Sequence, residues 1–527
     1  MSDSASPVLL RVYQNLLDSV AEEMGSALER TGFSANIKER RDYSCAVFDA
    51  AGDMVAQAAH IPVHLGSTPL SVRAAIDAHR FRPGDVILLN DPYQGGTHLP
   101  DLTMVAGVFE ADHAAPTFYV ANRAHHADVG GAVRGSMALF TEIYQEGLRI
   151  PPVLLRDRGR VAKDVETLLL ANMRQPVERR GDLRAQLSAN EVGDRALQRL
   201  LACQPRAELL AYCGHLQDAA DRHVRALLRR IPSGRYEAED ELESDGVTPE
   251  RIALRVTIEV DHDRACFDFS RSSPQVRGGL NTNPAVVLSA VFYVLRGLAG
   301  EEIPANAGCL RSVEVRTAPG TVLDPRLPAA VAGGNVETSQ RLVDLLFRGL
   351  APALPDLVPA QSQGTMNNLT LGSTGAGGRT FSYYETMGGG AGGSARGPGA
   401  SAVHSHMTNT RNTPIEVLEH ALPIRVREYS IRRGTGGAGR HGGGEGIARE
   451  FELLEPVMAA LLTERRYIEP AGMAGGSPGA CGRNRLLLPG ASEWTELPSK
   501  WVGELPAGSR LRIETPGGGG WGHDRDR

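Results

Sequence analysis

Cysteine is scarce in this chain, and its placement argues against two common kinds of site. The 527 residues include six cysteines, and no two of them are spaced as C-x-x-C. This spacing argues against a disulfide framework and against a thiolate zinc site. We therefore expect a reducing compartment, the cytoplasm. The six are Cys45, Cys203, Cys213, Cys266, Cys309 and Cys481.

Long apolar runs and long basic runs are also missing. No uncharged stretch of about 18 apolar residues occurs, and the first residues lack a basic segment followed by an apolar core. We therefore expect neither a membrane-spanning nor a secreted protein. The net charge is −6 and no extended run of Lys or Arg is present, which argues against nucleic acid and anionic membranes as partners. Small molecules and other proteins are the expected partners.

A nucleotide-binding motif is the third absence. The pattern G-x-x-x-x-G-K-[ST] does not occur. Residues 91–97 do not match the D-x-G-G-T phosphate loop of actin-like ATPases, because the acidic Asp91 is offset. We therefore expect no self-contained ATP site.

The chain does contain enough apolar sequence for a large fold. Hydrophobic residues make up 42%, and the length exceeds that of one ordinary domain. Helical and strand-like patterns both occur, so we predict a multidomain α+β protein with mixed and antiparallel sheets. The expected parts are an N-terminal domain with a metal site at 1–233, a β-rich middle segment at 234–330 and a Gly-rich C-terminal domain at 331–527.

The same patterns predict individual elements. Helices are expected at 7–28, 68–79, 285–299, 336–350 and over most of 162–230, and strands at 44–49, 54–57, 86–89, 102–109, 117–126, 235–245, 252–260 and 265–270. Glycine clusters follow beyond residue 361. They are typical of linkers, but apolar strands alternate with them, so we favour ordered turns and close backbone approaches.

The stretch 90–131 gathers histidines and aspartates between two apolar runs. If the strands at 102–109 and 117–126 pair with Phe109 opposite Thr117, the residue opposite Asp101 is His125. Opposed side chains in such a ladder have β-carbons about 5 Å apart, which suits two ligands of one ion. A slip of one residue would present His126 instead. Together with His98, these residues form a candidate metal site.

Blander interpretations exist for each of these residues. Histidines and aspartates near turns are most often capping or solvated groups. Asp42, at the entrance of the hairpin 44–57, is either a strand-edge charge or a carboxylate that faces the site. His60 and His64 are expected to be structural or to line a pocket.

A second polar concentration lies at 404–416. On a strand, His404 and His406 would point to one face, with Asn409 close behind them. These three residues are candidates for substrate binding. The alternative is a hydrogen-bonded turn network rich in Asn and Thr.

Several ordered motifs resemble those of the hydantoinase B/oxoprolinase family. They include R-D-Y-S, N-D-P-Y, G-T-H-L-P-D, H-H-A-D-V-G-G and G-D-L-R-A-Q, and the resemblance extends over 5–524. The positions are 41–44, 90–93, 96–101, 125–131, 181–186, 268–270, 273–275, 384–386, 404–416 and 515–522. Two departures are Arg271, where relatives carry glycine, and Ser405, where threonine is common.

The resemblance implies a catalytic subunit that works with a separate hydantoinase A-type ATPase in a hetero-oligomer. ATP and Mg would bind to that partner, and the substrate would be a cyclic amide such as a hydantoin, 5-oxoproline or a lactam. Implied metal ligands are Asp42, His98, Asp101 and His125, and the set accepts Mn, Fe, Co or Zn. Asp128 and Glu385 are candidate general bases. The alternatives are a subunit of an ATP-dependent ketone carboxylase and a non-catalytic assembly subunit.

Overall fold

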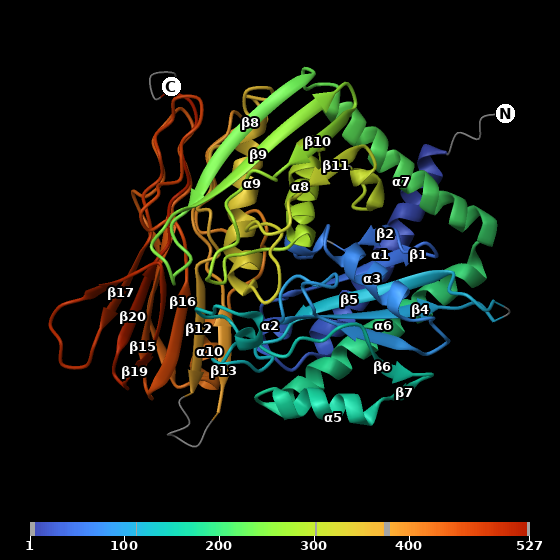
Figure 1. Ribbon diagram of the computed structural model, residues 1–527, viewed down its shortest axis with the longest axis horizontal. Coiled ribbons are helices and arrows are strands. Elements are labelled where there is room, and N and C mark those ends of the chain that lie inside the picture. The colour runs from blue at the N-terminus through green and yellow to red at the C-terminus, as the bar shows by residue number, and fades with distance from the viewer. Residues whose placement is uncertain (1–5, 59, 112, 301–302, 374–379, 524–527) are drawn as a thin grey trace.

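The computed structural model describes residues 6–58, 60–111, 113–300, 303–373 and 380–523. Its strands form four sheets, with helices packed between and around them (Figure 1). Three sheets are wholly antiparallel and one contains a parallel pair. The predicted α+β class with mixed and antiparallel sheets is therefore confirmed.

A seven-stranded antiparallel sheet forms the N-terminal part of the fold, in the order β2-β1-β5-β4-β3-β6-β7. Alternate residues of its strands face opposite sides. Met104 and Val120 belong to one hydrophobic core, whereas Val105 and Ala121 belong to another. The strands are β1 (Tyr43–Asp49), β2 (Met54–Gln57), β3 (Val86–Leu89), β4 (Asp101–Val108), β5 (Phe118–His125), β6 (Val153–Asp157) and β7 (Arg160–Val161).

Helices cover both faces of this sheet. Helix α1 begins at Pro7, a residue suited to the first helical turn, and buries Leu17, Val20, Met24 and Leu28 at helical spacing. It packs with α6 on one face, and α3 lies on the other. The N-terminal helices are α1 (Pro7–Thr31), α2 (Ala35–Lys38), η1 (Pro62–His64), α3 (Thr68–Ala78), α4 (Ile143–Glu146), α5 (Lys163–Asn172), α6 (Pro176–Cys203) and α7 (Arg206–Leu228).

The middle of the chain adds a four-stranded sheet in the order β11-β10-β9-β8. Helices α8 and α9 pack between this sheet and the rest of the fold (Figure 1). Their apolar side chains contribute to the largest hydrophobic core, which draws residues from 1–233, 234–330 and 331–527. The elements are β8 (Gly234–Leu242), β9 (Ile252–Asp261), β10 (Arg264–Asp268), α8 (Pro284–Ala299), η2 (Ala307–Leu310), β11 (Val313–Arg316), η3 (Gly334–Thr338) and α9 (Ser339–Leu350). The three-domain division stays a prediction.

Two further sheets enclose a separate C-terminal core, drawn in orange and red in Figure 1. One has the order β13-β12-β16-β19 and the other β14-β15-β20-β17-β18. The elements are β12 (Asn368–Ser373), β13 (Ser382–Glu385), α10 (Ile415–Ala421), β14 (Ile424–Arg432), β15 (Gly446–Leu453), β16 (Val457–Leu462), β17 (Arg483–Leu487), β18 (Thr495–Leu497), β19 (Lys500–Leu505) and β20 (Arg510–Glu514).

Glycine-rich segments near these sheets pack backbone against backbone. We call residues 388–400, 436–446, 471–480 and 515–522 the glycine stack. The N–H of Gly437 donates to the carbonyl of Gly518, and the N–H of Gly518 donates to that of Gly444. A β-carbon on Gly443 would lie 1.9 Å from the Gly518 carbonyl oxygen. Only glycine permits such an approach, so the predicted close backbone contacts are confirmed.

Buried charges connect β8, α9 and the segment that follows β16. Arg341 lies 3.3 Å from both Asp240 and Glu464, and its side chain is fully buried. Three buried cations thus face three buried carboxylates. We call this set the ion network: Asp240, Arg341, Asp344, Glu464, Arg465 and Lys500.

Helices long and apolar enough to cross a bilayer are absent from the described ranges.

Candidate metal centre

The hairpin of β4 and β5 has the predicted register. Asp101 lies opposite His125, and Val108 lies opposite Phe118 at the other end of the ladder. His126 follows the end of β5 and turns the other way, where its Nε2 lies 2.9 Å from Gln186 Oε1 on α6. The choice between the two histidines is therefore decided by the strand's alternation: His125 faces Asp101, and His126 faces the helix.

One ligand atom from each of His98, Asp101 and His125 lies within 4.8 Å of the other two. His98 Nε2 is 3.1 Å from Asp101 Oδ1, and His125 Nδ1 is 3.3 Å from the same oxygen. All three side chains are at most 3% exposed. We call these three residues the triad.

The triad fits the dimensions of a small divalent cation. Bonds of about 2.0–2.2 Å in a tetrahedral arrangement place neighbouring donor atoms about 3.4 Å apart. The separations of 3.1 and 3.3 Å approach this value. In the described part of the chain, His98 Nδ1 and His125 Nε2 are buried without a hydrogen-bond partner. Two imidazoles and one carboxylate are ligands that Mn, Fe, Co and Zn all accept.

The second oxygen of Asp101 is held by neighbours outside the triad. Thr97 Oγ1 donates to Asp101 Oδ2 at 2.8 Å, and His64 Nε2 lies 3.2 Å from the same atom. His64 Nδ1 is in turn 2.8 Å from Ser44 Oγ. Such outer contacts fix the orientation of a metal-binding carboxylate. His64 therefore supports the triad, as the expectation of a structural or pocket-lining role allowed.

The electrostatics of the triad centre on one carboxylate. Burial opposes ionisation of Asp101, but His98 and His64 hold the pKa of its carboxyl well below the usual value. Burial would lower the pKa of His98, yet the adjacent Asp101 raises it above the ordinary value. Burial lowers the pKa of His125 and outweighs the attraction of Asp101. The site thus favours an ionised Asp101 carboxylate, which is the form in which a carboxylate binds a cation.

Asp42 lies beside the triad but outside the set of atoms within 4.8 Å. Its carboxylate is 3.6 Å from Arg40 Nη2, and its carbonyl accepts a hydrogen bond from the N–H of His125 at 3.0 Å. Its charge also acts to raise the pKa values of His98 and His125. The predicted role of Asp42 as a fourth ligand stays a prediction.

Tyr384 covers the triad from the C-terminal half of the chain. Its ring stacks on His125, with 4.7 Å between centroids, and Arg40 lies over the same ring at 4.9 Å. The Tyr384 hydroxyl donates to Asn368 Oδ1 at 2.7 Å. In the sequence, Tyr384 appears only as part of the motif at 384–386, because no local pattern connects β13 with His125.

Glu385 follows Tyr384 on β13 and therefore points to the opposite face. Its carboxylate accepts from the N–H of Thr413 at 2.9 Å and pairs with Arg449 at 2.5 Å. These contacts place Glu385 away from the triad, among structural donors. The assignment of a general base to Glu385 stays a prediction.

Asp128 is buried and surrounded by donors. Its carboxylate accepts from the N–H groups of Gly130 and Gly135, each at 2.9 Å, and from Arg174 Nη1 at 2.9 Å. Ser382 Oγ lies 3.4 Å away. These hydrogen bonds stabilise the loop after β5. A general base at Asp128 likewise stays a prediction.

A strand at His404 and His406, one of the two interpretations of this segment, does not form. The segment is irregular apart from a single bridge at Val403, and His406 has a φ of 55°, in the left-handed region. That φ breaks the alternation that would place both imidazoles on one face. Of the two interpretations of this segment, the strand does not form, and the hydrogen-bonded turn network agrees with the bonds of Thr408, Thr410 and Asn412.

The three candidate substrate-binding residues accordingly contact different parts of the protein. His406 Nε2 lies 3.1 Å from Asp344 of the ion network. Asn409 Nδ2 donates to the carbonyl of His60 at 3.2 Å. His404 has no hydrogen-bond partner for either ring nitrogen within the described ranges, and burial lowers its pKa to about 3. Substrate binding by these residues stays a prediction.

The fold and the triad define a multidomain α+β protein with a metal-type donor set in its N-terminal sheet. Solved structures share this fold over 99% of the chain. The ATP-dependent caprolactamase from Pseudomonas jessenii matches with a TM-score of 0.90, 30% identity and 92% coverage of that chain. A nucleotide-free acetone carboxylase matches with a TM-score of 0.87, 17% identity and 76% coverage, which shows likeness of fold alone.

The chain belongs to the hydantoinase B/oxoprolinase family, whose model matches residues 6–524. 5-Oxoprolinase 1 of Arabidopsis thaliana is 38% identical over 98% of the chain, but the match covers 42% of that protein. An uncharacterized protein of Methanocaldococcus jannaschii is 37% identical over 99% of the chain and 91% of its own length. The chain thus spans about two fifths of several curated relatives.

Proposed function

We propose that this chain is the catalytic subunit of an ATP-dependent enzyme that hydrolyses a cyclic amide of the hydantoin, 5-oxoproline or lactam type. One observation carries the proposal: the buried triad of His98, Asp101 and His125, in a chain 30% identical to an ATP-dependent caprolactamase. Membership in a family that includes 5-oxoprolinases supports the substrate class.

The proposed cofactor is a divalent cation held by His98, Asp101 and His125, with Asp42 as a further candidate ligand. Mn, Zn, Fe and Co all suit this donor set. When bound, such a cation supplies Lewis acidity, which polarises a carbonyl or acidifies water. Of the chain's own residues, Thr97 and His64 hold Asp101 in place, and Tyr384 fixes the plane of the His125 ring. Burial of the triad keeps bulk water away from it.

ATP and Mg are assigned to a partner. The sequence carries no nucleotide-binding motif, and the chain corresponds to 42% of a 5-oxoprolinase. The same region forms nearly the whole of the Methanocaldococcus protein. We therefore assign the remaining part to a separate hydantoinase A-type ATPase subunit, which makes the enzyme a hetero-oligomer of the cytoplasm.

The proposed reaction activates the amide before water attacks it. The partner transfers the γ-phosphoryl group of ATP to the amide oxygen, which turns a poor leaving group into phosphate. In this subunit, water then adds to the same carbon and the C–N bond breaks, which frees the amine and leaves an acyl phosphate. A second water hydrolyses the acyl phosphate to the carboxylate and inorganic phosphate. His404, His406 and Asn409 remain the proposed substrate contacts, and Asp128 and Glu385 the proposed general bases.

The test is reconstitution of the chain with its ATPase partner. We expect about one divalent ion per chain, and ATP consumption with hydantoins, 5-oxoproline or lactams. Asp101→Ala should stop turnover while assembly persists. Retention of label from labelled bicarbonate in the product would identify a carboxylase instead. Unchanged turnover in Asp101→Ala would identify an assembly subunit.

A further inference from the structure

Asn335 brings an amide group to the triad from another part of the chain. Its Nδ2 lies 3.3 Å from Nε2 of His98, the ring nitrogen that faces Asp101. Asn335 is buried, with 4% of the residue exposed. Its other polar atom, Oδ1, has no hydrogen-bond partner among the residues that the structure describes. Asn335 therefore belongs to the immediate surroundings of the metal centre.

The backbone around Asn335 is shaped for this approach. Asn335 lies in η3, a π-helical turn, and such turns occur frequently at functional sites. The preceding residue must be glycine, because a β-carbon on Gly334 would lie 1.9 Å from the carbonyl oxygen of Asn281. Ser339 Oγ donates to the Asn335 carbonyl at 2.7 Å. These contacts fix the Asn335 backbone beside the triad.

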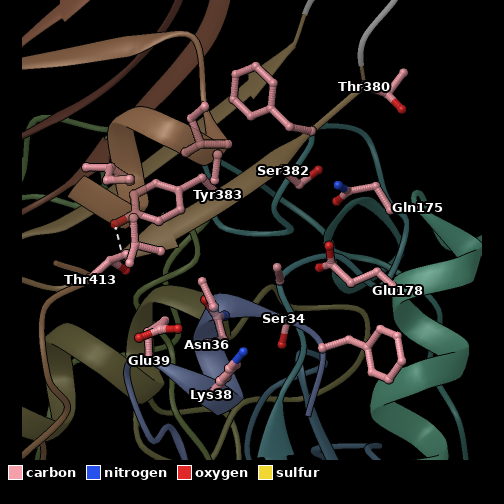
Figure 2. A pocket seen from close by; sticks show the side chains of 18 residues that line it. Ser34, Asn36, Lys38, Glu39, Gln175, Glu178, Thr380, Ser382, Tyr383 and Thr413 are labelled. Atoms are coloured by element: carbon pink, nitrogen blue, oxygen red, sulfur yellow. Dashed lines mark hydrogen bonds between the residues drawn. The ribbon is translucent and has the colours of Figure 1, made fainter. Parts of the chain in front are cut away.

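Tyr384 also reaches the triad from a distant segment, where it stacks on His125. Its neighbour Tyr383 points the other way, into a cavity of about 350 Å³ beside β13 (Figure 2). None of the described residues that line this cavity belongs to the triad or to η3. The contact between Asn335 and His98 is therefore a feature of the metal centre and separate from this cavity.

The neighbours of His98 Nε2 make opposite demands on it. Asp101 Oδ1, at 3.1 Å, is a carboxylate oxygen that only accepts, whereas Asn335 Nδ2, at 3.3 Å, only donates. A neutral imidazole nitrogen carries either a proton or a lone pair, so Nε2 satisfies one neighbour and opposes the other. A protonated imidazole meets the same conflict, because it can only donate. The conflict ends when the amide rotates by half a turn, since Oδ1 then takes the place of Nδ2.

We propose that Asn335 presents Oδ1 to the triad and is a further ligand of the divalent cation, together with His98, Asp101 and His125. This inference rests on the proposed metal centre. The position now held by Nδ2 is 3.3 Å from His98 Nε2, close to the separation of about 3.4 Å between neighbouring donors in a tetrahedral site. Because an amide oxygen is neutral, it adds a ligand without cancelling the charge on which Lewis acidity depends.

The test is titration of the metal-free full chain with Co²⁺ alone, monitored by visible absorption, which reports the number and kind of ligands of the bound ion. Asn335→Leu removes both polar amide atoms at similar volume. It should weaken Co²⁺ binding by about 100-fold, the upper range for residues around a metal site, and change the absorption spectrum. Asn335→Asp keeps an oxygen at this position and should bind Co²⁺ at least as tightly as the wild type.

Two further variants separate a ligand from other roles. Thr97→Val removes a contact that only holds Asp101, so it should weaken binding but leave the spectrum of bound Co²⁺ unchanged. Gln340→Leu removes another buried amide, which donates to the carbonyl of Ser405. It should leave both the affinity and the spectrum unchanged.

Wild-type affinity in Asn335→Leu would overturn the assignment of Asn335. A weaker affinity with an unchanged spectrum, as expected for Thr97→Val, would overturn it as well, and so would equal losses in Asn335→Leu and Asn335→Asp. Absence of Co²⁺ binding in the wild type would instead overturn the metal centre as a whole, and this assignment with it.

Discussion

The triad and the ion network are both clusters of buried charged or titratable side chains, but their charges are balanced differently. In the ion network, three carboxylates face three permanent cations, with Arg341 between Asp240 and Glu464. In the triad, one carboxylate faces imidazoles, whose charge depends on protonation. The first arrangement is complete without a ligand. The second would gain a full counter-charge from a bound cation, which supports its proposed role as the metal site.

The largest effect should follow removal of a triad imidazole. His98→Ala deletes one of three donors, so the bound divalent metal should fall from about one ion per chain to nearly none. Turnover by the reconstituted enzyme should be lost with it. Metal analysis by mass spectrometry after gel filtration measures this.

The matched control is His126→Ala. His126 is equally buried and adjacent to His125, but it faces Gln186 on α6. It should therefore retain the metal. Equal metal loss in both variants would show that the triad is no metal site.

A substitution in the ion network should instead lower the free energy of unfolding. Arg341→Met leaves Asp240 and Glu464 buried with one cation fewer, and loss of one partner from a buried pair costs about 3–5 kcal/mol. Denaturant unfolding should report this cost, with metal binding retained. Arg316→Met removes an exposed pair with Glu314 and should leave the unfolding midpoint almost unchanged. A similar midpoint for both variants would contradict the contrast between the two clusters.

Glu337 lies between the two clusters and should make stability depend on pH. Burial, with the nearby charge of Glu464, raises its pKa from 4.5 to about 7. The folded protein therefore holds a proton that the unfolded chain releases, so this group destabilises the fold progressively as pH rises from about 4.5 to about 7. Glu337→Gln should remove this dependence. Relative to the wild type, its free energy of unfolding should rise by about 3 kcal/mol between low pH and pH 8.

Denaturant unfolding of Glu337→Gln and of the wild type at pH 5 and pH 8 measures how the free energy of unfolding of each protein changes with pH. Glu337 Oε1 accepts from Asn368, which in turn accepts from Tyr384, so the neutral amide preserves the connection to His125. Parallel pH profiles for the two proteins would contradict the raised pKa.

The smallest effect should come from the support of Asp101. Thr97→Val removes the hydroxyl that donates to Asp101 Oδ2, and loss of such an outer contact weakens metal affinity by about 10- to 100-fold. Competition with a chelator measures the affinity. Thr117→Val deletes a comparable bond to Glu110 at the far end of β5, and should leave it unchanged. Equal effects would point to a general loss of hairpin stability.

Much of the N-terminal site was predictable from sequence because it is local. The two apolar runs and the polar loop between them define one register, and that register places Asp101 opposite His125. The alternation of a strand then assigns His126 to the helix side. Strands β8, β9 and β10 and helices α3, α8 and α9 were likewise predicted from the periodicity of apolar residues.

What was not predictable depends on contacts between distant segments. Tyr384 reaches His125 from more than 250 residues away. The ion network draws its members from β8, α9, the segment after β16 and the start of β19. No local sequence pattern indicates either set of contacts. The choice between a strand and a turn network at His404 could not be made from sequence for another reason: the left-handed φ that excludes the strand is adopted by His406, a non-glycine residue.

The glycine stack imposes an order on folding. Its final segment, 515–522, is in contact with segments made much earlier: Gly518 bonds to Gly437 and Gly444, and Gly519 to Gln361 and Gly393. During synthesis, residues 388–400 and 436–446 are therefore made at least 69 residues before the segment 515–522 that pairs with them. A nascent chain halted before that point would leave these backbone amides unpaired, and unpaired edges make an incomplete fold prone to aggregation.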